Sequence, residues 1–441
     1  MPLERRTFLT GAGAVTAGAL ATTAVGAPAL AAPPGSVPDP EPGVRRVGTG
    51  LDALVRTDFA ELRGQRVGVI SNPTGVDSAY RHLVDLMHGS GSVQVVAAFG
   101  PEHGFRGSAQ AGGSEGTGVD ARTGITVYDA YGATQARWES MYTRSGVETV
   151  VFDIQDVGAR FYTYIWTMYT SMVAAARVGL RYVVLDRPNP VGGRAYGPMM
   201  TPGYTSGVGL KEIVQQHGMT VGELARFFNA EFLSADAGGP VELHVVQCRN
   251  WKRDLLAADT DLPWVLPSPN MPTPDTALVY PGTCLFEGVA SITEGRGTCR
   301  PFELIGGLAT EFDYHWGDRL NARDLPGVEF REAYFSPTAA GQKPALLNKL
   351  CAGVEVKIVD RSAFDPIRTA VAMLVEARKY PAFAWRQDAW DTVRPYWIDK
   401  LTGSPRLRTM IDAGADVADV VGAWSDELAA FDRQRQPYLL Y

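Results

Sequence analysis

The sequence predicts an α/β protein with a doubly wound, largely parallel sheet, followed by a second, smaller α+β domain at the C-terminal end. Three observations favour this fold class. Short valine-rich runs alternate with stretches of helical periodicity, most of these runs lack strict polar–apolar alternation, and polar loops follow several of them. Strands that are buried on both faces have this continuous apolar character, and alternating strands and helices are typical of parallel sheets.

Five apolar runs are predicted to form the strands of the sheet. They span residues 66–71, 93–99, 148–154, 181–186 and 241–247. A short helix is expected over residues 79–88, between the first two strands. This order predicts an open doubly wound sheet over about residues 44–255.

Two longer helices between the strands have clear sequence signatures. In residues 159–179, one face of the predicted helix is apolar and consists of Phe161, Ile165, Met168, Met172 and Ala176. This pattern is typical of an amphipathic helix, and Gly179 is expected to end it. Residues 219–232 begin with Thr220 and Glu223 at the spacing of a capping box. We therefore expect helices in both segments.

The chain after residue 255 is predicted to start with an irregular crossover, because six prolines lie between Pro263 and Gly282. A strand is expected over residues 354–360. Helices are expected near residues 365–379, 405–413 and 416–432. The predicted domains are therefore 46–255 and 256–441.

The N-terminal segment has the features of a twin-arginine export signal over residues 1–32, followed by a Pro-rich linker over residues 33–45. Cleavage near Ala32 would remove Glu4, Arg5 and Arg6 and change the net charge from −7 to −8. No later run reaches the ~18 apolar residues that a membrane span needs. We expect an exported protein, extracellular, wall-associated or periplasmic, with no stable membrane insertion after cleavage.

Composition narrows the possible partners. The 441 residues are 45% hydrophobic and 20% charged, and the negative net charge argues against nucleic-acid binding. The four cysteines permit one or two disulfides but form no CxxC motif, and the six histidines lack metal-binding spacing. We therefore predict neither a metal nor a cofactor, and the sequence leaves the oligomeric state open.

Polar loops follow four of the predicted strands, as "SNPTG", "GPEHGFRG", "DIQDVGAR" and "DRPNPVGG". Parallel strands end at one edge of the sheet, so these loops are expected to share a cleft. Glu102 is the best candidate for proton transfer. A carboxyl group directly after a buried strand can be desolvated, which raises its pKa and favours the protonated form, and His103 can orient it. Alternatively, Glu102 caps a turn and His103 packs in the core.

The same loops offer other polar groups. Asp153 is either a second catalytic carboxylate or a structural cap, and a Gly-rich segment of the second domain adds a further acid, Glu294. Arg160 and Arg187 in these loops either bind an anionic group of the substrate or form ordinary ion pairs at the surface. The expected substrate-binding residues are Asn72, Arg106, Asp156, Arg160, Tyr162, Arg187, Asn189, Asn270, Glu287 and Arg296.

Five long motifs give a specific resemblance: "GPEHGFRG", "FDIQDVGARFYTYIWTM", "LDRPNPVGG", "LPWVLPSPNMPTPDTALVYPGTCLFEG" and "EGRGTCRPFELIGG". Together with "IDKLTGS" they resemble the exo-β-N-acetylmuramidase family of peptidoglycan hydrolases over roughly residues 46–441. The resemblance implies a Rossmann-like catalytic domain, a smaller C-terminal domain and a cleft between them. It also implies a peptidoglycan-derived glycan substrate, cleaved to release terminal N-acetylmuramic acid from the non-reducing end.

The resemblance further implies that Glu102 of "PEHG" is catalytic, beside His103, and that the other motifs line the sugar site. Glu294 or Asp153 would be the second acid. The lactyl carboxylate of the substrate calls for an arginine, for which the candidates are Arg160, Arg187 and Arg296. Tyr162, Tyr164 and Trp166 either stack on sugars or belong to the core. Cys299 departs from the expected pattern, which leaves a disulfide with Cys284 open.

Three other functions stay possible at this point. One is an exported hydrolase of another N-acetylhexosamine, and a second is a non-catalytic protein that binds wall glycans. The third is an exported oxidoreductase, since a Rossmann-like fold does not determine function.

Overall fold

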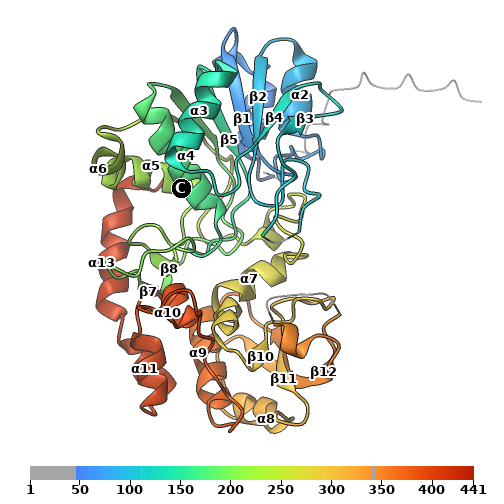
Figure 1. Cartoon of the computed structure of the whole chain (residues 1–441), viewed down its shortest axis with the longest axis vertical. Coiled ribbons are helices and arrows are strands. Elements are labelled where there is room, and N and C mark those ends of the chain that lie inside the picture. Colours follow the sequence, from blue (N-terminus) through green and yellow to red (C-terminus); the bar gives the residue numbers. More distant parts are fainter. Residues whose placement is uncertain (1–45, 111, 339–342) are drawn as a thin grey trace, which may run out of the picture. The chain divides into compact units, whose positions relative to one another are not determined.

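The computed structural model describes residues 46–441 except residue 111 and residues 339–342 (Figure 1). The predicted signal, residues 1–32, and the predicted linker, residues 33–45, lie outside the described residues. All the described residues belong to one compact unit of the chain. In the part that the structure describes, no helix has both the length and the apolar character needed to cross a membrane.

A seven-stranded sheet forms the first part of the fold, and all its neighbouring strands are parallel except β3, which runs antiparallel to β4. Its order is β3-β4-β2-β1-β5-β6-β9. All five predicted strands are confirmed to within one residue at each end. The strands are β1 (Arg66–Ser71), β2 (Gln94–Gly100), β3 (Gly118–Val119), β4 (Thr126–Asp129), β5 (Thr149–Asp153), β6 (Arg181–Leu185) and β9 (Glu242–Val246).

Helices cover both faces of this sheet, which confirms the doubly wound prediction. Along β5, Val150 and Phe152 pack into one hydrophobic core and Val151 packs into another. One core contains α3 (Gln135–Ser145), α4 (Tyr164–Arg177) and α5 (Val221–Glu231), and the other contains α1 (Gly50–Arg56) and α2 (Leu83–Ser90). Because both faces are apolar, the strand sequences lack polar alternation.

Helix boundaries differ from the predictions where a side chain or a loop intervenes. The capping box of Thr220 and Glu223 is present at the start of α5, as predicted. The helix predicted from residue 79 begins at Leu83, because the His82 ring accepts the Val84 N–H as its N-cap. The predicted helix that includes Phe161 begins only at Tyr164, because Arg160 in the preceding segment donates its N–H to the Gln215 carbonyl in β8 (Val214–Gln216).

A smaller four-stranded antiparallel sheet forms the second part, in the order β10-β11-β13-β12. The predicted strand 354–360 corresponds to β13, and helices are confirmed near 365–379 and 405–413. The prediction of a single helix over residues 416–432 is wrong, because the backbone leaves the helical conformation at Trp424, where φ is −120°, and the segment forms two helices. The elements are β10 (Ile292–Thr293), β11 (Leu304–Leu308), β12 (Val328–Phe335), β13 (Cys351–Ile358), α8 (His315–Asn321), α9 (Pro366–Ala377), α11 (Arg406–Asp412), α12 (Val417–Gly422) and α13 (Ser425–Arg435).

The proline-rich crossover was predicted to be irregular, and from residue 274 onward this is wrong. Residues Pro274–Thr283 form α7, with Thr273 as N-cap and Pro274 in the first turn, where a missing N–H has no cost. The helix continues into the 3₁₀ segment η3 (Cys284–Gly288). The remaining elements are α6 (Leu233–Ala237), α10 (Trp397–Thr402) and the hairpin strands β7 (Tyr196–Met199) and β8 (Val214–Gln216).

Candidate active site

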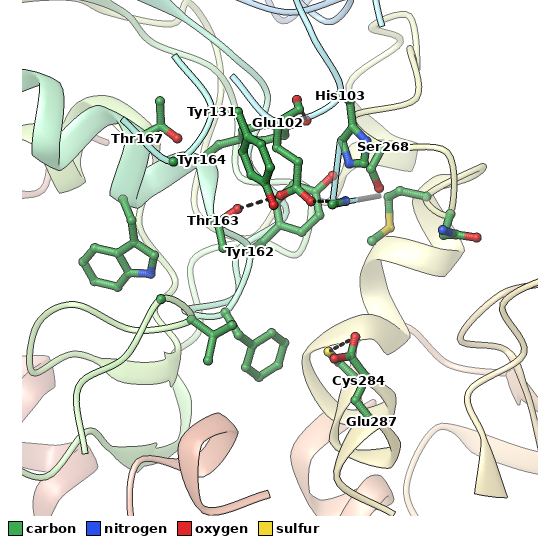
Figure 2. Close-up of a pocket in the computed structure, with 18 of the residues that line it drawn as sticks. Glu102, His103, Tyr131, Tyr162, Thr163, Tyr164, Thr167, Ser268, Cys284 and Glu287 are labelled. Atoms are coloured by element: carbon green, nitrogen blue, oxygen red, sulfur yellow. Dashed lines mark hydrogen bonds between the residues drawn. The ribbon is translucent and has the colours of Figure 1, made fainter. Parts of the chain in front are cut away.

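A cavity of about 1120 Å³ lies between the loops that follow β2, β4 and β5 and the segment formed by α7, η3 and α10 (Figure 2). Six of the residues predicted for the site line it, namely Glu102, His103, Tyr162, Asn270, Glu287 and Arg296. The structure therefore brings together the first-domain motif "PEHG" and the Gly-rich segment of the second domain.

Glu102 lies in the turn directly after β2, and its carboxylate is held from two sides. Oε1 accepts the backbone N–H of Gly112 at 2.9 Å, and Oε2 accepts the hydroxyl of Thr163 at 3.3 Å. Figure 2 shows both bonds and the position of the carboxylate among other lining residues. Since the side chain is only half-buried, the carboxyl is fixed in place yet open to a ligand.

His103 has a strained backbone and a defined ring orientation. Its φ of 70° falls in the left-handed region, which non-glycine residues occupy rarely. The ring Nδ1 lies 3.2 Å from the Ala109 carbonyl, which can only accept, so Nδ1 carries the proton. In the neutral ring Nε2 is therefore a hydrogen-bond acceptor.

Arg106 belongs to the support of this turn and does not line the cavity. Its guanidinium bonds Asp85 and Asp120, each at 2.8 Å. Glu115 accepts the backbone N–H of Arg106 at 3.1 Å and that of Ser108 at 2.8 Å. The expected substrate role of Arg106 is therefore replaced by a structural one, because ion pairs already occupy its donors.

Asp153 and Arg187 form a buried ion pair instead of contributing to the cavity. Arg187 donates to the Asp153 carboxylate through Nε at 2.5 Å and Nη2 at 2.9 Å, and also to the Val76 carbonyl. Asp153 is fully buried and Arg187 is 6% exposed. The geometry excludes Asp153 as a second catalytic acid in this conformation and excludes Arg187 as a substrate anchor.

Arg160 is also buried, and its donors bond main-chain carbonyls. Nη1 donates to Pro198 and Ile213, and Nη2 donates to Leu401. Burial lowers the pKa of this guanidinium. Arg160 thus connects the β7–β8 hairpin to α10, and the prediction that it binds an anionic substrate group is wrong for this arrangement.

Three further predicted binding residues fold the loops instead of lining the cavity. Asn72 accepts the hydroxyl and N–H of Thr74, and Asn189 donates to the Met219 carbonyl. Asp156 accepts the Gly158 N–H at 2.7 Å and lies 3.1 Å from the His217 ring. These side chains form hydrogen bonds within and between the loops, mostly with backbone groups, which is a common role of Asn and Asp in turns.

The three aromatic residues considered for sugar stacking line the cavity but are at most 7% exposed. Tyr164 donates its hydroxyl to the Pro267 carbonyl, and Trp166 donates Nε1 to the Arg160 carbonyl. Trp166 also stacks on Phe228 in the core. The core interpretation therefore fits Trp166, Tyr162 and Tyr164 better than a stacking role.

The second domain contributes one carboxylate to the cavity wall among the described residues, the buried Glu287. It accepts Arg296 Nη2 at 2.5 Å and Trp397 Nε1 at 3.2 Å. Burial raises the pKa of Glu287, but the charge and hydrogen bond of Arg296 outweigh it, so the net shift is downward. Glu294 is fully buried, bonds Arg296 Nη1 and does not line the cavity, so its predicted role as second acid is wrong here.

All four cysteines lie within the described residues, and all are free thiols. Cys284 is buried at the cavity wall and its thiol faces Glu287, whereas Cys299 is exposed. The disulfide that the sequence left open between them is therefore absent from this structure. In the part of the chain that is described, no group of three or more His, Cys, Asp or Glu side chains is arranged to hold a metal ion.

Several lining residues were not found from the sequence. Tyr131 follows β4, a four-residue strand that the prediction missed, and Thr163 lies just before α4. Ser268, Tyr280 and Trp397 also line the cavity. The sequence feature that could have identified Tyr131 is "DAYGAT", in which an aromatic residue and a glycine directly follow a short apolar stretch.

Comparison with known proteins agrees with this architecture. Residues 67–275 and 278–441 match the N-terminal and C-terminal models described as exo-β-N-acetylmuramidase NamZ. The peptidoglycan β-N-acetylmuramidase NamZ of Bacillus subtilis (strain 168) is 42% identical over 401 residues, which are 90% of this chain and 92% of the relative.

Two crystal structures of DUF1343 family proteins from Bacteroides fragilis NCTC 9343 are also similar. The first has a TM-score of 0.79 at 33% identity, and the second has a TM-score of 0.70 at 29% identity. Each comparison covers 90% of this chain and 99% of the solved chain. By sequence and fold, this chain belongs to the exo-β-N-acetylmuramidase NamZ family.

Proposed function

We propose that this chain is a glycoside hydrolase that releases terminal β-linked N-acetylmuramic acid from the non-reducing end of peptidoglycan fragments, with Glu102 as proton donor. The position of Glu102 carries the proposal, because its carboxyl is held in a cavity large enough for a sugar. The muramidase relative from Bacillus subtilis supports the substrate class.

In the proposed reaction, protonated Glu102 donates its proton to the glycosidic oxygen as the bond from that oxygen to C1 of the muramic sugar breaks. The resulting Glu102 carboxylate is stabilised by the Gly112 N–H and the Thr163 hydroxyl. It can then accept a proton from the water that attacks C1. Because both donors already point at the carboxylate, little reorganisation is needed during the reaction.

The second carboxylate of the proposed mechanism is Glu287, which replaces the buried Glu294 and Asp153. Arg296 keeps Glu287 ionised, so it is suited to accept hydrogen bonds from the sugar and to stabilise positive charge at C1. We assign it this acceptor role. Because Glu102 acts on the same face of the sugar in both steps, the mechanism predicts retention of the anomeric configuration, and inversion observed by product NMR would contradict it.

Arg296 is the candidate for the lactyl carboxylate, because it alone among Arg160, Arg187 and Arg296 lines the cavity. Its Nη1 and Nη2 already pair with Glu294 and Glu287, so the group proposed to bind the lactyl carboxylate is Nε, which has no hydrogen-bond partner within the described residues. A hydrolase of another N-acetylhexosamine would not need this arginine. Comparing cleavage of muramic and glucosamine glycosides separates the two specificities, because only the muramic sugar carries the lactyl group.

We further propose that the protein is exported through the twin-arginine route and works next to the cell wall. The Arg5–Arg6 pair and the apolar run that follows support this proposal. Cell fractionation of the full chain and of a variant with both arginines changed to lysine tests it. Equal export of both forms would contradict twin-arginine transport.

The decisive test of the catalytic assignment is Glu102→Gln, assayed with the disaccharide of N-acetylmuramic acid linked to N-acetylglucosamine, because a leaving sugar must be protonated as the bond breaks. Loss of the proton donor is expected to lower kcat by at least about 10²-fold, with an unchanged melting temperature. Glu242→Gln is a matched control, because that side chain is 78% exposed on β9. Near-normal turnover by a folded Glu102→Gln variant would disprove the assignment.

A further inference from the structure

The cavity differs at its two ends, which lie on either side of Glu102. Figure 2 shows Tyr131 and Thr167 to one side of Glu102, with Cys284 and Glu287 across the cavity on the other side. Cys284 is 1% exposed and Glu287 5%, so this end is enclosed. Tyr131 is 36% exposed, so the other end is open to solvent.

The open end has a wall of hydroxyl groups. Thr163, at the N-cap of α4, and Thr167 and Thr170 within α4 all line the cavity. Their spacing of four and three residues places them along one side of the helix. At 1.5 Å per residue this row extends over about 10 Å. Thr163 and Thr170 already donate their hydroxyl protons, to Glu102 and to the Trp166 carbonyl, so their oxygens can accept hydrogen bonds from the hydroxyl groups of a sugar.

The remaining surface of the open end is aromatic and apolar. Tyr131 and Ala133 belong to the loop between β4 and α3, and the cavity wall as a whole also includes Gly207, Val208 and Leu210. Partial burial and the negative charge of Glu102 raise the pKa of Tyr131, so the phenol stays protonated. The ring is thus a neutral, amphipathic surface next to the proton donor.

We propose that this open end binds the sugar that follows the scissile bond, on the reducing-end side, with Tyr131 as its stacking surface. The inference rests on the proposed function. An exo-acting hydrolase places one terminal sugar in the enclosed end, so the rest of the glycan must extend through the open end. Glu102 protonates the oxygen of the leaving sugar, which therefore lies next to Tyr131.

The test compares two substrates in the full chain. One is the disaccharide of N-acetylmuramic acid linked to N-acetylglucosamine, and the other is methyl β-N-acetylmuraminide, which has no second sugar. Tyr131→Ala is expected to lower kcat/KM for the disaccharide about tenfold more than for the methyl glycoside, equivalent to about 1.4 kcal/mol. Tyr131→Phe keeps the ring and is expected to keep the preference for the disaccharide.

Tyr334→Ala is the matched control, because Tyr334 is 56% exposed on β12 and does not line the cavity. Equal losses on both substrates in Tyr131→Ala would overturn the proposal. A similar loss on both substrates in Tyr131→Phe would also overturn it, because the hydroxyl would then act on Glu102. Failure of the unmodified protein to cleave either substrate would instead contradict the proposed function.

Discussion

Arg296 and Glu287 form an ion pair at the enclosed end of the cavity, with 2.5 Å between Nη2 and Oε1. The second guanidinium nitrogen of Arg296 binds Glu294 at 3.0 Å. Arg296 therefore pairs with two buried carboxylates, and the charge of Lys343 adds to its effect. This arrangement accounts for the downward shift of the Glu287 pKa, which opposes the effect of burial.

Replacing Arg296 by Gln is expected to destabilise the fold by roughly 3–5 kcal/mol, because removing one partner leaves buried charges uncompensated. The measurement is the urea midpoint. The control is Arg331→Gln, where the arginine is 64% exposed and pairs with Glu355, so the loss should stay below about 1 kcal/mol. Equal losses for the two variants would contradict the structural role of Arg296.

Thr163 is expected to support catalysis through Glu102. Thr163→Val removes the hydroxyl that bonds Oε2 at 3.3 Å, and a hydrogen bond to a charged group contributes about 1.5–3 kcal/mol. We expect kcat to fall at least about tenfold, with little change in KM, and Thr163→Ser to restore most of the loss. Thr143→Val, which removes an exposed hydroxyl from α3, is the control. Unchanged kcat in Thr163→Val would exclude this support.

The strands of the large sheet were predictable because their sequences carry a strong physical signal. Residues such as Val150, Val151 and Phe152 are all buried, alternately on the two faces, so a continuous apolar run predicts a doubly covered strand. β4 was missed because only four residues pair there. The helix α7 was missed because Pro274 and Pro281 were interpreted as breakers, although the first lies where a helix tolerates proline.

The site was predictable only in part, because the sequence indicates which residues follow a strand but not where their side chains point. Glu102 and Asp153 both lie at the ends of parallel strands, yet only Glu102 reaches the cavity. Asp153 faces Arg187 inside the protein. That difference depends on packing between segments far apart in the chain, and periodicity carries no information about it.

The pH dependence of stability offers a last prediction, centred on His82. Burial and then the charge of Arg106 lower the pKa of His82 to about 4 from 6.5. The neutral ring accepts the Val84 N–H through Nδ1, which caps α2, and protonation would abolish that bond. The folded-state pKa lies below the unfolded value, so this stability is present above about pH 6.5 and is lost as the pH falls toward 4.

Between about pH 7.5 and 5 the contribution of His82 should fall by about 2 kcal/mol, measured as the change in unfolding free energy in urea. His82→Asn keeps a capping side chain but does not titrate, so its stability should decrease less over this range. His88→Asn is the matched control, because His88 lies exposed on the same helix. If His82→Asn and the unmodified protein lost equal stability on acidification, His82 would not be the titrating group, and the loss would belong to other side chains.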